Sequence, residues 1–473
     1  MLRRHVLFAG GLAALTILVA LNGSAFSQTE AKLPEDLVSK IDRAANDVLV
    51  ETGVPSASVA VVKDGAIAYL RAYGEAKLEP KTPAKSEMRY SIGSISKQFT
   101  AASVLLLQEE GKLSLDDTVW KYIPNLTRAN EVTIRELLSH TSGYQDYWPQ
   151  DYVPPFMMQA IASDKILDMW ARKPLDFDPG TRWQYSNTNY VIAGVIVEKV
   201  SGMPLLQFLQ TRIFSPLGMK SVANIDQEKL GDTDATGYMR YALGPLHPAP
   251  KEGKGWLFAA GELAMPAGDL ARWDVSMMDQ KLLKPASYQQ LESEVHLKSG
   301  VGTQYGLGVD VTMFSDHRMI SHGGEVSGFT TQNNVFPDDR VAVVVLTNQD
   351  AARASGDLAR RISALMFTSS DTSAQAKTEQ ARKIFRDLQQ GKIDRTLFTE
   401  NANSYFSEQA LKDFAGSLGP LGTPFEFVQT NQALRGGMTL RVYRIKFRQN
   451  QELRAWTFEM PDGKLEQYQV STN

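Results

Sequence analysis

The 473-residue sequence contains no cysteine. Disulfide bonds, cysteine-based metal sites and lipid attachment through a cysteine are therefore excluded. Histidine is also scarce, with six residues and no His-Glu-x-x-His pair, which argues against a zinc hydrolase. No serine stands in a Gly-x-Ser-x-Gly elbow, so an α/β-hydrolase is not predicted. Any catalytic site in this chain must therefore be built without cysteine, without a His-Glu-x-x-His zinc motif and without a Gly-x-Ser-x-Gly serine.

The sequence likewise lacks a charge excess of either sign. Its net charge is −3, which gives no electrostatic reason to expect nucleic acid or an anionic membrane surface as a partner. Hydrophobic residues make up 43% and charged residues 22%, the proportions of an ordinary globular protein. This length is enough for two or three domains with a large buried core.

The N-terminus has the pattern of a secretory signal peptide. Arg3 and Arg4 precede an apolar run over residues 6–21, and small residues at positions 25 and 27 form a cleavage site. The predicted signal peptide is residues 1–27, which makes the protein exported, either periplasmic or secreted, with no stable membrane anchor after cleavage. The alternative is an uncleaved anchor, although sixteen residues is short against the ~20 that span a bilayer.

Residues 34–368 are predicted to form one unit in which both ends of the segment share an antiparallel sheet. A helical pattern over residues 34–52 is followed by two β-rich runs joined by Lys63-Asp64-Gly65, a hairpin signal. A nearly uncharged helix follows Ser94, and residues 112–290 show mostly short helical patterns and turns. Further strands are predicted at residues 306–313, 318–321, 328–336 and 341–347, followed by a helix over 352–367. The predicted fold class is α/β (α+β), with a sheet flanked by helices and a helical subdomain.

A second, smaller unit is predicted after a polar linker at residues 369–378. Residues 379–473 contain two helical patterns and then four strand-like runs, which predict a small α+β accessory domain. It could serve as a packing partner, a lid over a cleft or a dimerisation surface. Its aromatic residues are predicted to belong to its core.

Ser94 and Lys97 form the first candidate for chemistry. Three residues apart on a helix, the two side chains share a face at ~5–6 Å between Cβ atoms. A serine hydroxyl becomes a good nucleophile when a neighbouring base takes its proton, and a desolvated lysine can be that base. A lone Ser-x-x-Lys is expected about once by chance in a chain of this size, so the pair needs partners.

Two later stretches supply candidate partners. Tyr185-Ser186-Asn187 follows Pro179-Gly180 and precedes a predicted helix, and His322-Gly323-Gly324-Glu325 follows a predicted strand. Tyr185 could instead be a core tyrosine, Asn187 a helix cap and His322 a structural histidine. His140 is interpreted as structural.

In order and approximate spacing, Ser94-Ile95-Ser96-Lys97, Tyr185-Ser186-Asn187 and His322-Gly323-Gly324 resemble the three motifs of the class C β-lactamase and D-Ala-D-Ala carboxypeptidase family of serine hydrolases. Residues 111–117 and 137–143 resemble connecting segments of the same family. The resemblance covers about residues 34–368 and implies a β-lactamase/transpeptidase-like fold.

The resemblance assigns a role to each residue of the three motifs. Ser94 would be the acylated nucleophile, Lys97 its proton acceptor and Tyr185 a second proton-transfer residue, whose phenolate nearby cations such as Lys97 would favour. Asn187 would orient the substrate and Lys97. His322 stands where lactamases usually have lysine, and the glycines after it, including Gly324, would let a strand edge approach the substrate. The backbone N–H groups of Ser94 and Glu325 would form the oxyanion hole.

The predicted function is cleavage of an amide or ester through a Ser94 acyl-enzyme, with no metal and no organic cofactor. The substrate would be a small molecule or a peptide, including cell-wall peptides or esters. A D-amino-acid peptidase or carboxypeptidase comes first, then a carboxylesterase, then a weak β-lactamase, because His322 replaces the usual lysine. An alternative of another class is a non-catalytic protein that binds peptidoglycan or peptides.

Overall fold

The computed structural model describes residues 32–149, 153–367, 374–448 and 451–472. The predicted signal peptide, residues 1–27, lies outside the described residues. Within the described ranges no single helix is long and apolar enough to cross a membrane. One bent pair, Asn187–Ser201 with Leu205–Phe214, passes the same test of length and composition, with a bend of 71°.

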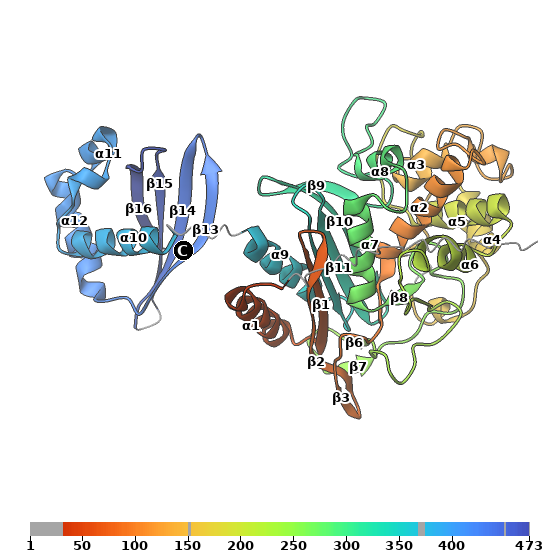
Figure 1. Cartoon of the computed structure of the whole chain (residues 1–473), viewed down its shortest axis with the longest axis horizontal. Helices are drawn as coiled ribbons and strands as arrows, with labels where there is room; N and C mark the ends of the chain where they lie inside the picture. Colours follow the sequence, from red (N-terminus) through yellow and green to blue (C-terminus); the bar gives the residue numbers. More distant parts are fainter. Residues whose placement is uncertain (1–31, 150–152, 368–373, 449–450, 473) are drawn as a thin grey trace, which may run out of the picture.

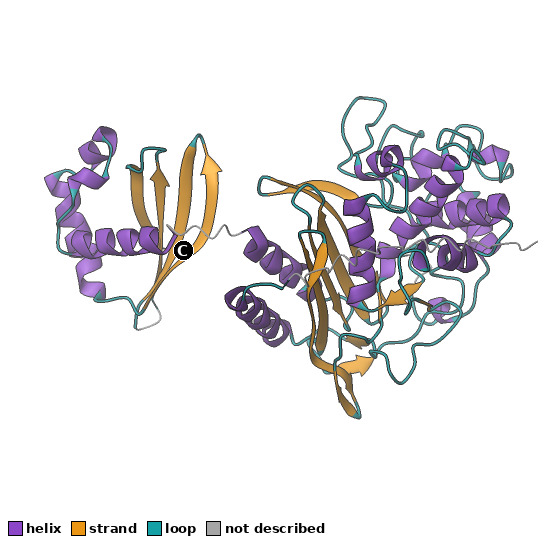
Figure 2. Cartoon of the chain, in the orientation of Figure 1, coloured by secondary structure: helices purple, strands orange, loops and turns teal. Residues whose placement is uncertain are grey.

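A seven-stranded antiparallel sheet forms the centre of the first unit (Figures 1 and 2). Its strands, in sheet order, are β3 (Lys81–Pro83), β2 (Ala66–Leu78), β1 (Ser56–Lys63), β12 (Val341–Thr347), β11 (Phe329–Phe336), β10 (His317–Val326) and β9 (Asp310–Phe314). β1, the first strand of this unit, pairs with β12, its last strand, with Ala57 opposite Thr347 and Val62 opposite Ala342. The predicted sheet shared by the two ends of this segment is therefore confirmed.

The hairpin between β1 and β2 forms where the sequence predicts it. Asp64 and Gly65 have φ of 54° and 77°, the left-handed pair that a two-residue turn of this kind requires. β1 and β12 are buried along almost their whole length because helices cover both faces of the sheet.

The helices lie on the two faces in separate layers. Figure 2 shows α1 and α9 on one side of the sheet and α7 on the other. The buried residues of α1 and α9 join β1 in one core, while α2 and α7 join the helical region in a second and larger core. The bounds of these helices are α1 Glu35–Thr52, α2 Ser96–Glu109, α7 Ala267–Asp279 and α9 Ala354–Phe367.

The region between residues 112 and 290 consists of short helices joined by turns and loops, as predicted. It also holds short strands that the sequence did not reveal, because runs of two or three residues have no readable period. The helices are α3 Ile134–Leu138, α4 Ser163–Ile166, α5 Asn187–Ser201, α6 Leu205–Leu209 and α8 Pro285–Glu292. The short strands are β5 Ala223–Asn224, β6 Tyr238–Arg240, β7 Leu246–Pro248 and β8 Leu263–Met265, and β8 also pairs with β4 Tyr90–Ser91, which precedes this region.

β10 is longer than predicted, and this corrects the position of His322. The strand was expected over residues 318–321 because the two following glycines break the β pattern, but it continues to Val326. Gly323 and Gly324 pair with Gln332 and Thr331 of β11. His322 therefore lies inside the strand, not at its end.

The second unit consists of helices and a four-stranded antiparallel sheet in the order β13-β14-β15-β16. Its buried residues form a core of their own, from Ala381 to Tyr468. α10 begins at Ala374, so residues 374–378 of the predicted linker are helical. The elements are α10 Ala374–Gln389, α11 Glu400–Tyr405, α12 Glu408–Leu418, β13 Glu426–Arg435, β14 Met438–Lys446, β15 Glu452–Glu459 and β16 Leu465–Thr472.

Candidate active site

Ser94 lies in a short 3-10 turn, Gly93–Ile95, immediately before α2. Gly93 has a φ of +53°, and a Cβ at this position would lie 2.7 Å from the backbone nitrogen of Glu325. Glycine is therefore required by both the backbone conformation and the close approach of β10. The turn sets the Ser94 hydroxyl at the start of the helix that carries Lys97.

Lys97 makes three hydrogen bonds at the centre of the site. Its Nζ donates to Ser94 Oγ at 3.0 Å, to Asn187 Oδ1 at 2.8 Å and to the carbonyl of Ala260 at 2.8 Å. The side chain is fully buried. These contacts bring together the nucleophile and the second motif, as the resemblance implied.

Burial lowers the pKa of Lys97 to about 7, because an ammonium loses hydration inside the protein. The charge of Asp146 acts in the opposite direction and raises the pKa. At neutral pH a large fraction of Lys97 is therefore the free amine, the form that can accept the proton of Ser94.

Tyr185 lies beside the same lysine. The Lys97 Nζ is 5.0 Å from the centre of the Tyr185 ring, and Tyr185 is hydrogen-bonded to Ser94. Burial raises the pKa of Tyr185 above its ordinary value, while the bond to Ser94 works against that shift. The expectation of a phenolate is therefore wrong. Desolvation is the largest effect, the charges of Asp146 and Asp310 act in the same direction, and Tyr185 keeps its proton.

Asn187 is the first residue of α5, and its amide has a contact on each side. Its Oδ1 accepts from Lys97, while its Nδ2 donates to the carboxylate of Asp146 at 3.2 Å and 3.3 Å. The backbone N–H of Asn187 donates to Asp146 Oδ1 at 3.0 Å. Asn187 therefore contacts Lys97 directly, which a helix cap alone would not require.

His322 is buried, 5% exposed, and both of its ring nitrogens contact protein atoms. Nδ1 lies 2.5 Å from the Gly323 carbonyl, which can only accept, so Nδ1 carries the proton. Nε2 then accepts from the Tyr305 hydroxyl at 2.9 Å. Burial, followed by the charge of Lys97, lowers the pKa of His322 to about 4. His322 is therefore neutral at pH 7 and supplies no cation.

Gly324 and Glu325 place a strand edge against the Ser94 turn. A Cβ at Gly324 would lie 1.9 Å from the carbonyl of Ile92, so no other residue fits there without moving the backbone. Thr331 donates to the same Ile92 carbonyl at 3.0 Å and fastens β11 to this turn. The Glu325 carboxylate accepts from the backbone of Ala351 at 2.9 Å.

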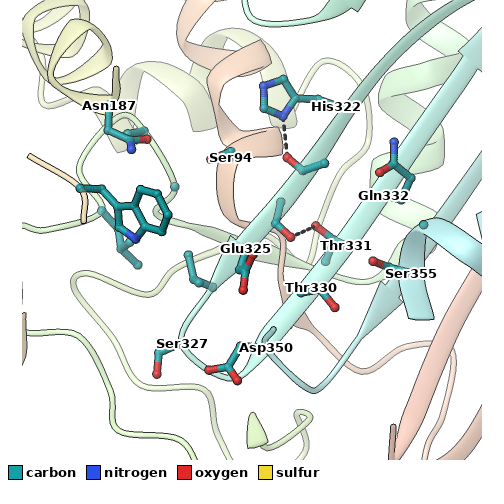
Figure 3. Close-up of a pocket in the computed structure, with 18 of the residues that line it drawn as sticks. Ser94, Asn187, His322, Glu325, Ser327, Thr330, Thr331, Gln332, Asp350 and Ser355 are labelled. Atoms are coloured by element: carbon teal, nitrogen blue, oxygen red, sulfur yellow. Dashed lines mark hydrogen bonds between the residues drawn. The ribbon is translucent and has the colours of Figure 1, made fainter. Parts of the chain in front are cut away.

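These residues border a cleft of about 890 Å³ (Figure 3). Figure 3 shows Ser94 between Asn187 and His322, with Glu325 on β10 and Gln332 on the neighbouring β11. One wall is apolar and is formed by Tyr147, Trp148, Pro154, Met157 and Leu257. The other wall is polar and includes Gln332, Arg353 and Arg360. The cleft therefore offers both apolar and polar side chains to a molecule bound beside Ser94.

Three parts of the site were missed by sequence reasoning. Asp146 contacts Asn187, Tyr305 contacts His322, and the Ala260 carbonyl binds Lys97. Asp146 closely follows the family-like residues 137–143, which was a signal that could have found it. A backbone carbonyl leaves no such signal, because every residue has one.

His140 has the structural environment that was predicted. Its ring packs 4.2 Å from the Tyr185 ring and its Nδ1 accepts from the Ser186 backbone at 3.2 Å. Burial lowers the pKa of His140 well below its ordinary value. Across the described residues, no group of three or more histidine, aspartate or glutamate side chains is arranged to hold a metal ion.

A family model and individual related sequences point to the same protein family. The model of the Beta-lactamase family matches residues 27–366. Penicillin-binding protein 4* of Bacillus subtilis (strain 168) is 30% identical over 308 residues, 62% of this chain and 68% of that protein. A D-aminopeptidase of Brucella anthropi is 29% identical over 303 residues, 62% of this chain and 56% of that protein. The chain thus spans less than two thirds of that D-aminopeptidase.

Solved structures show the same fold. A D-stereospecific amidohydrolase from Streptomyces sp. is similar with a TM-score of 0.60 and 27% identity, covering 68% of this chain and 96% of that one. The octameric penicillin-binding protein homologue from Pyrococcus abyssi is similar in fold, with a TM-score of 0.64 and 21% identity, over 92% of this chain and 99% of that one.

Proposed function

Because the chain belongs to the Beta-lactamase family and is a serine hydrolase of that fold, as its three motifs predicted, we propose that it cleaves amide bonds next to a D-amino acid through an acyl-enzyme on Ser94. The observation that carries this proposal is the contact between Ser94 Oγ and a buried lysine of which a large fraction is uncharged at neutral pH. A pure binding protein has no use for such a lysine, because burying an amine without a reaction to perform only costs stability.

The first half of the reaction forms the acyl-enzyme. The free amine of Lys97 takes the proton of Ser94, and Ser94 Oγ bonds to the substrate carbonyl carbon. The backbone N–H groups of Ser94 and Glu325 hold the negative oxygen of the tetrahedral intermediate. The carbon–nitrogen bond then breaks, the leaving nitrogen receives the Tyr185 phenol proton, and Lys97 returns a proton to Tyr185.

The second half releases the acyl group. A water molecule loses a proton to Lys97 as its oxygen bonds to the acyl carbon, and the ester bond to Ser94 breaks. Ser94 Oγ then takes that proton back from Lys97, so the enzyme ends in its starting state. Each role agrees with the directions of the pKa shifts, because Lys97 is the group that loses its proton readily and Tyr185 the group that keeps it.

The walls of the cleft favour a particular kind of substrate. Tyr147 and Trp148 follow Asp146, which contacts Asn187, so the apolar wall adjoins the second motif. An apolar side chain on the acyl residue would be buried there. Neutral His322 provides no positive charge for a substrate carboxylate, which favours an aminopeptidase or amidase over a carboxypeptidase or a β-lactamase.

The test is a panel of chromogenic substrates on the protein without residues 1–27. We expect turnover of D-phenylalanine p-nitroanilide well above that of the L-enantiomer and of a chromogenic cephalosporin. Labelling by a fluorophosphonate should add one adduct at Ser94, and Ser94→Ala should lose both the adduct and the turnover. A folded protein with no adduct and no turnover would disprove the acyl-enzyme.

A carboxylesterase is the second candidate. The apolar wall and the neutral His322 would also suit an uncharged ester. A nitrophenyl ester in the same panel separates the two, because an amidase cleaves the D-aminoacyl anilide and a simple esterase does not.

Export is the remaining part of the proposal. It rests on Arg3, Arg4 and the apolar residues 6–21, followed by small residues at positions 25 and 27. Cell-wall peptides with D-amino acids would then be available as substrates. N-terminal sequencing of the protein recovered from outside the cytoplasm should begin at Gln28, whereas an intact Met1 in a membrane fraction would indicate an uncleaved anchor.

A further inference from the structure

We propose that Asp146 is a positioning residue of the active site, which fixes the amide of Asn187 so that its oxygen faces Lys97. The inference rests on the proposed function, because it concerns how the same site keeps its base in place. Neither Asp146 nor its contact with Asn187 belongs to the three sequence motifs.

Asp146 forms hydrogen bonds with both the backbone and the side chain of Asn187. Oδ1 of Asp146 accepts the backbone N–H of Asn187 at 3.0 Å, and the carboxylate also accepts Nδ2 of the same residue. The backbone N–H of Trp148 donates to Asp146 Oδ1 at 3.2 Å, which fixes the carboxylate itself on its loop. The first turn of α5 and the loop before it are thereby joined at the side of the cleft.

These contacts determine which end of the amide meets the lysine. An asparagine side chain can rotate so that either its oxygen or its NH2 group faces a given neighbour. A carboxylate only accepts hydrogen bonds, so it attracts the NH2 group of Asn187 and leaves Oδ1 for Lys97 at 2.8 Å. The reverse orientation would place two hydrogen-bond donors against the Lys97 amine and an oxygen against the carboxylate.

The order of contacts defines the role. Asp146 binds Asn187, Asn187 binds Lys97, and Lys97 binds Ser94 at 3.0 Å. Asp146 acts on the nucleophile through two other side chains, so its loss should lower reactivity without removing any reacting group. It also contributes a negative charge that favours the protonated form of Lys97.

The decisive experiment is a double-mutant cycle. We expect Asp146→Ala to reduce the rate of fluorophosphonate labelling of Ser94, and kcat for the D-aminoacyl anilide, by about 10–100-fold, as for other residues that hold a reacting group in place. KM should stay within about twofold. In Asn187→Ala the amide that Asp146 orients is already absent, and the backbone contact that remains no longer places an oxygen at Lys97. Adding Asp146→Ala to that variant should therefore cost no more than about twofold.

Two further variants separate this role from general support of the fold. Asp146→Asn keeps one oxygen that can accept the Asn187 backbone N–H, so it should lose less activity than Asp146→Ala, and it replaces that variant in the cycle if Asp146→Ala does not fold. Asp168→Asn removes a carboxylate paired with Arg172 at 2.9 Å on the surface, and should leave labelling unchanged.

Losses that multiply in the double variant would overturn the inference, since Asp146 would then act independently of Asn187. A rise in KM at unchanged kcat would overturn it too. Failure of the proposed function itself looks different, because the wild-type protein would then show no labelling at Ser94.

Discussion

The hydroxyl of Tyr305 donates a hydrogen bond to Nε2 of His322 at 2.9 Å, on the side of the ring opposite the contact of Nδ1 with the Gly323 carbonyl. A proton on Nε2 would have to displace that donor, in addition to the cost of burying charge beside Lys97. The histidine found in place of the family's usual lysine is therefore a neutral group held within the sheet.

Tyr305→Phe should raise the pKa of His322 by about one unit, because a donor to the neutral form is lost while the shape is kept. The measurement is an NMR titration of the histidine Cε1 protons, with assignment by His322→Gln. The Tyr190 hydroxyl, which donates to the Leu138 carbonyl at 2.8 Å, supplies a matched control as Tyr190→Phe. An unchanged His322 titration in Tyr305→Phe would show that burial and Lys97 alone hold the ring neutral.

The rate of acylation should rise with pH through an apparent pKa near 7, the value at which Lys97 becomes a free amine. The measurement is kcat/KM for the D-aminoacyl anilide between pH 5 and 9. His322, with a pKa of about 4, titrates below this range.

A variant of Asp146 can check whether this rise of kcat/KM with pH reports the deprotonation of Lys97. Because the Asp146 carboxylate favours protonated Lys97, Asp146→Asn should move the apparent pKa downward. Burial raises the pKa of Asp146 itself to about 6. If kcat/KM of Asp146→Asn no longer rose with pH, the titrating group in the wild type would be the aspartate instead of Lys97.

Asp274→Asn should make the protein more stable at neutral pH. Burial raises the pKa of Asp274 to about 8, so the folded protein keeps this carboxyl protonated while the unfolded chain ionises it above its ordinary value of 3.8. The wild type therefore loses stability relative to the variant as pH rises from about 4 to 8. Asn333 Nδ2 donates to Asp274 Oδ1 at 2.8 Å, and an asparagine at 274 can accept this bond and return one.

Thermal unfolding at pH 5, 7 and 9 measures the difference. We expect the variant's advantage to grow between pH 5 and 7 and to exceed about 1 kcal/mol at pH 7. Activity should be unchanged. An advantage that shrank with rising pH would mean that Asp274 is ionised in the folded protein.

A chain that ends after Phe367 should keep its fold and its activity within about threefold. Among the described residues, the two cores around the seven-stranded sheet contain no buried residue beyond Ile362, and the third core contains none before Ala381. Removal of residues 368–473 therefore breaks no apolar cluster. Circular dichroism and the anilide assay test this, and a large change in KM would instead assign the second unit a part in the cleft.

Much of the fold could be predicted from the sequence because local signals agreed with the final packing. Asp64 and Gly65 are residues that a tight hairpin turn requires, and the helix after Ser94 carries few charges because it is buried on most sides. β10 was predicted too short for the opposite reason. Gly323 and Gly324 read as a strand end, but both remain paired with β11, and the Ser94 turn leaves no room for a side chain at Gly324.

The sequence predicted the three motifs of the site but not the protonation states of Lys97 and Tyr185. Spacing alone brought Ser94 and Lys97 together, since three residues on a helix fix their geometry. Whether Tyr185 or Lys97 gives up its proton depends on burial, which a linear sequence does not contain. The structure buries both, and desolvation then favours the neutral form of each: the free amine and the intact phenol.

The contacts between the two ends of the first unit have a consequence for the nascent chain during its synthesis. Thr331 reaches the Ile92 carbonyl across 239 positions of sequence, and Ser56 donates to Asn348 across 292. Contacts this remote form late, after most of the polypeptide has been synthesised. The nucleophile therefore exists long before the strands that complete its cleft, and a partly made chain cannot hydrolyse anything.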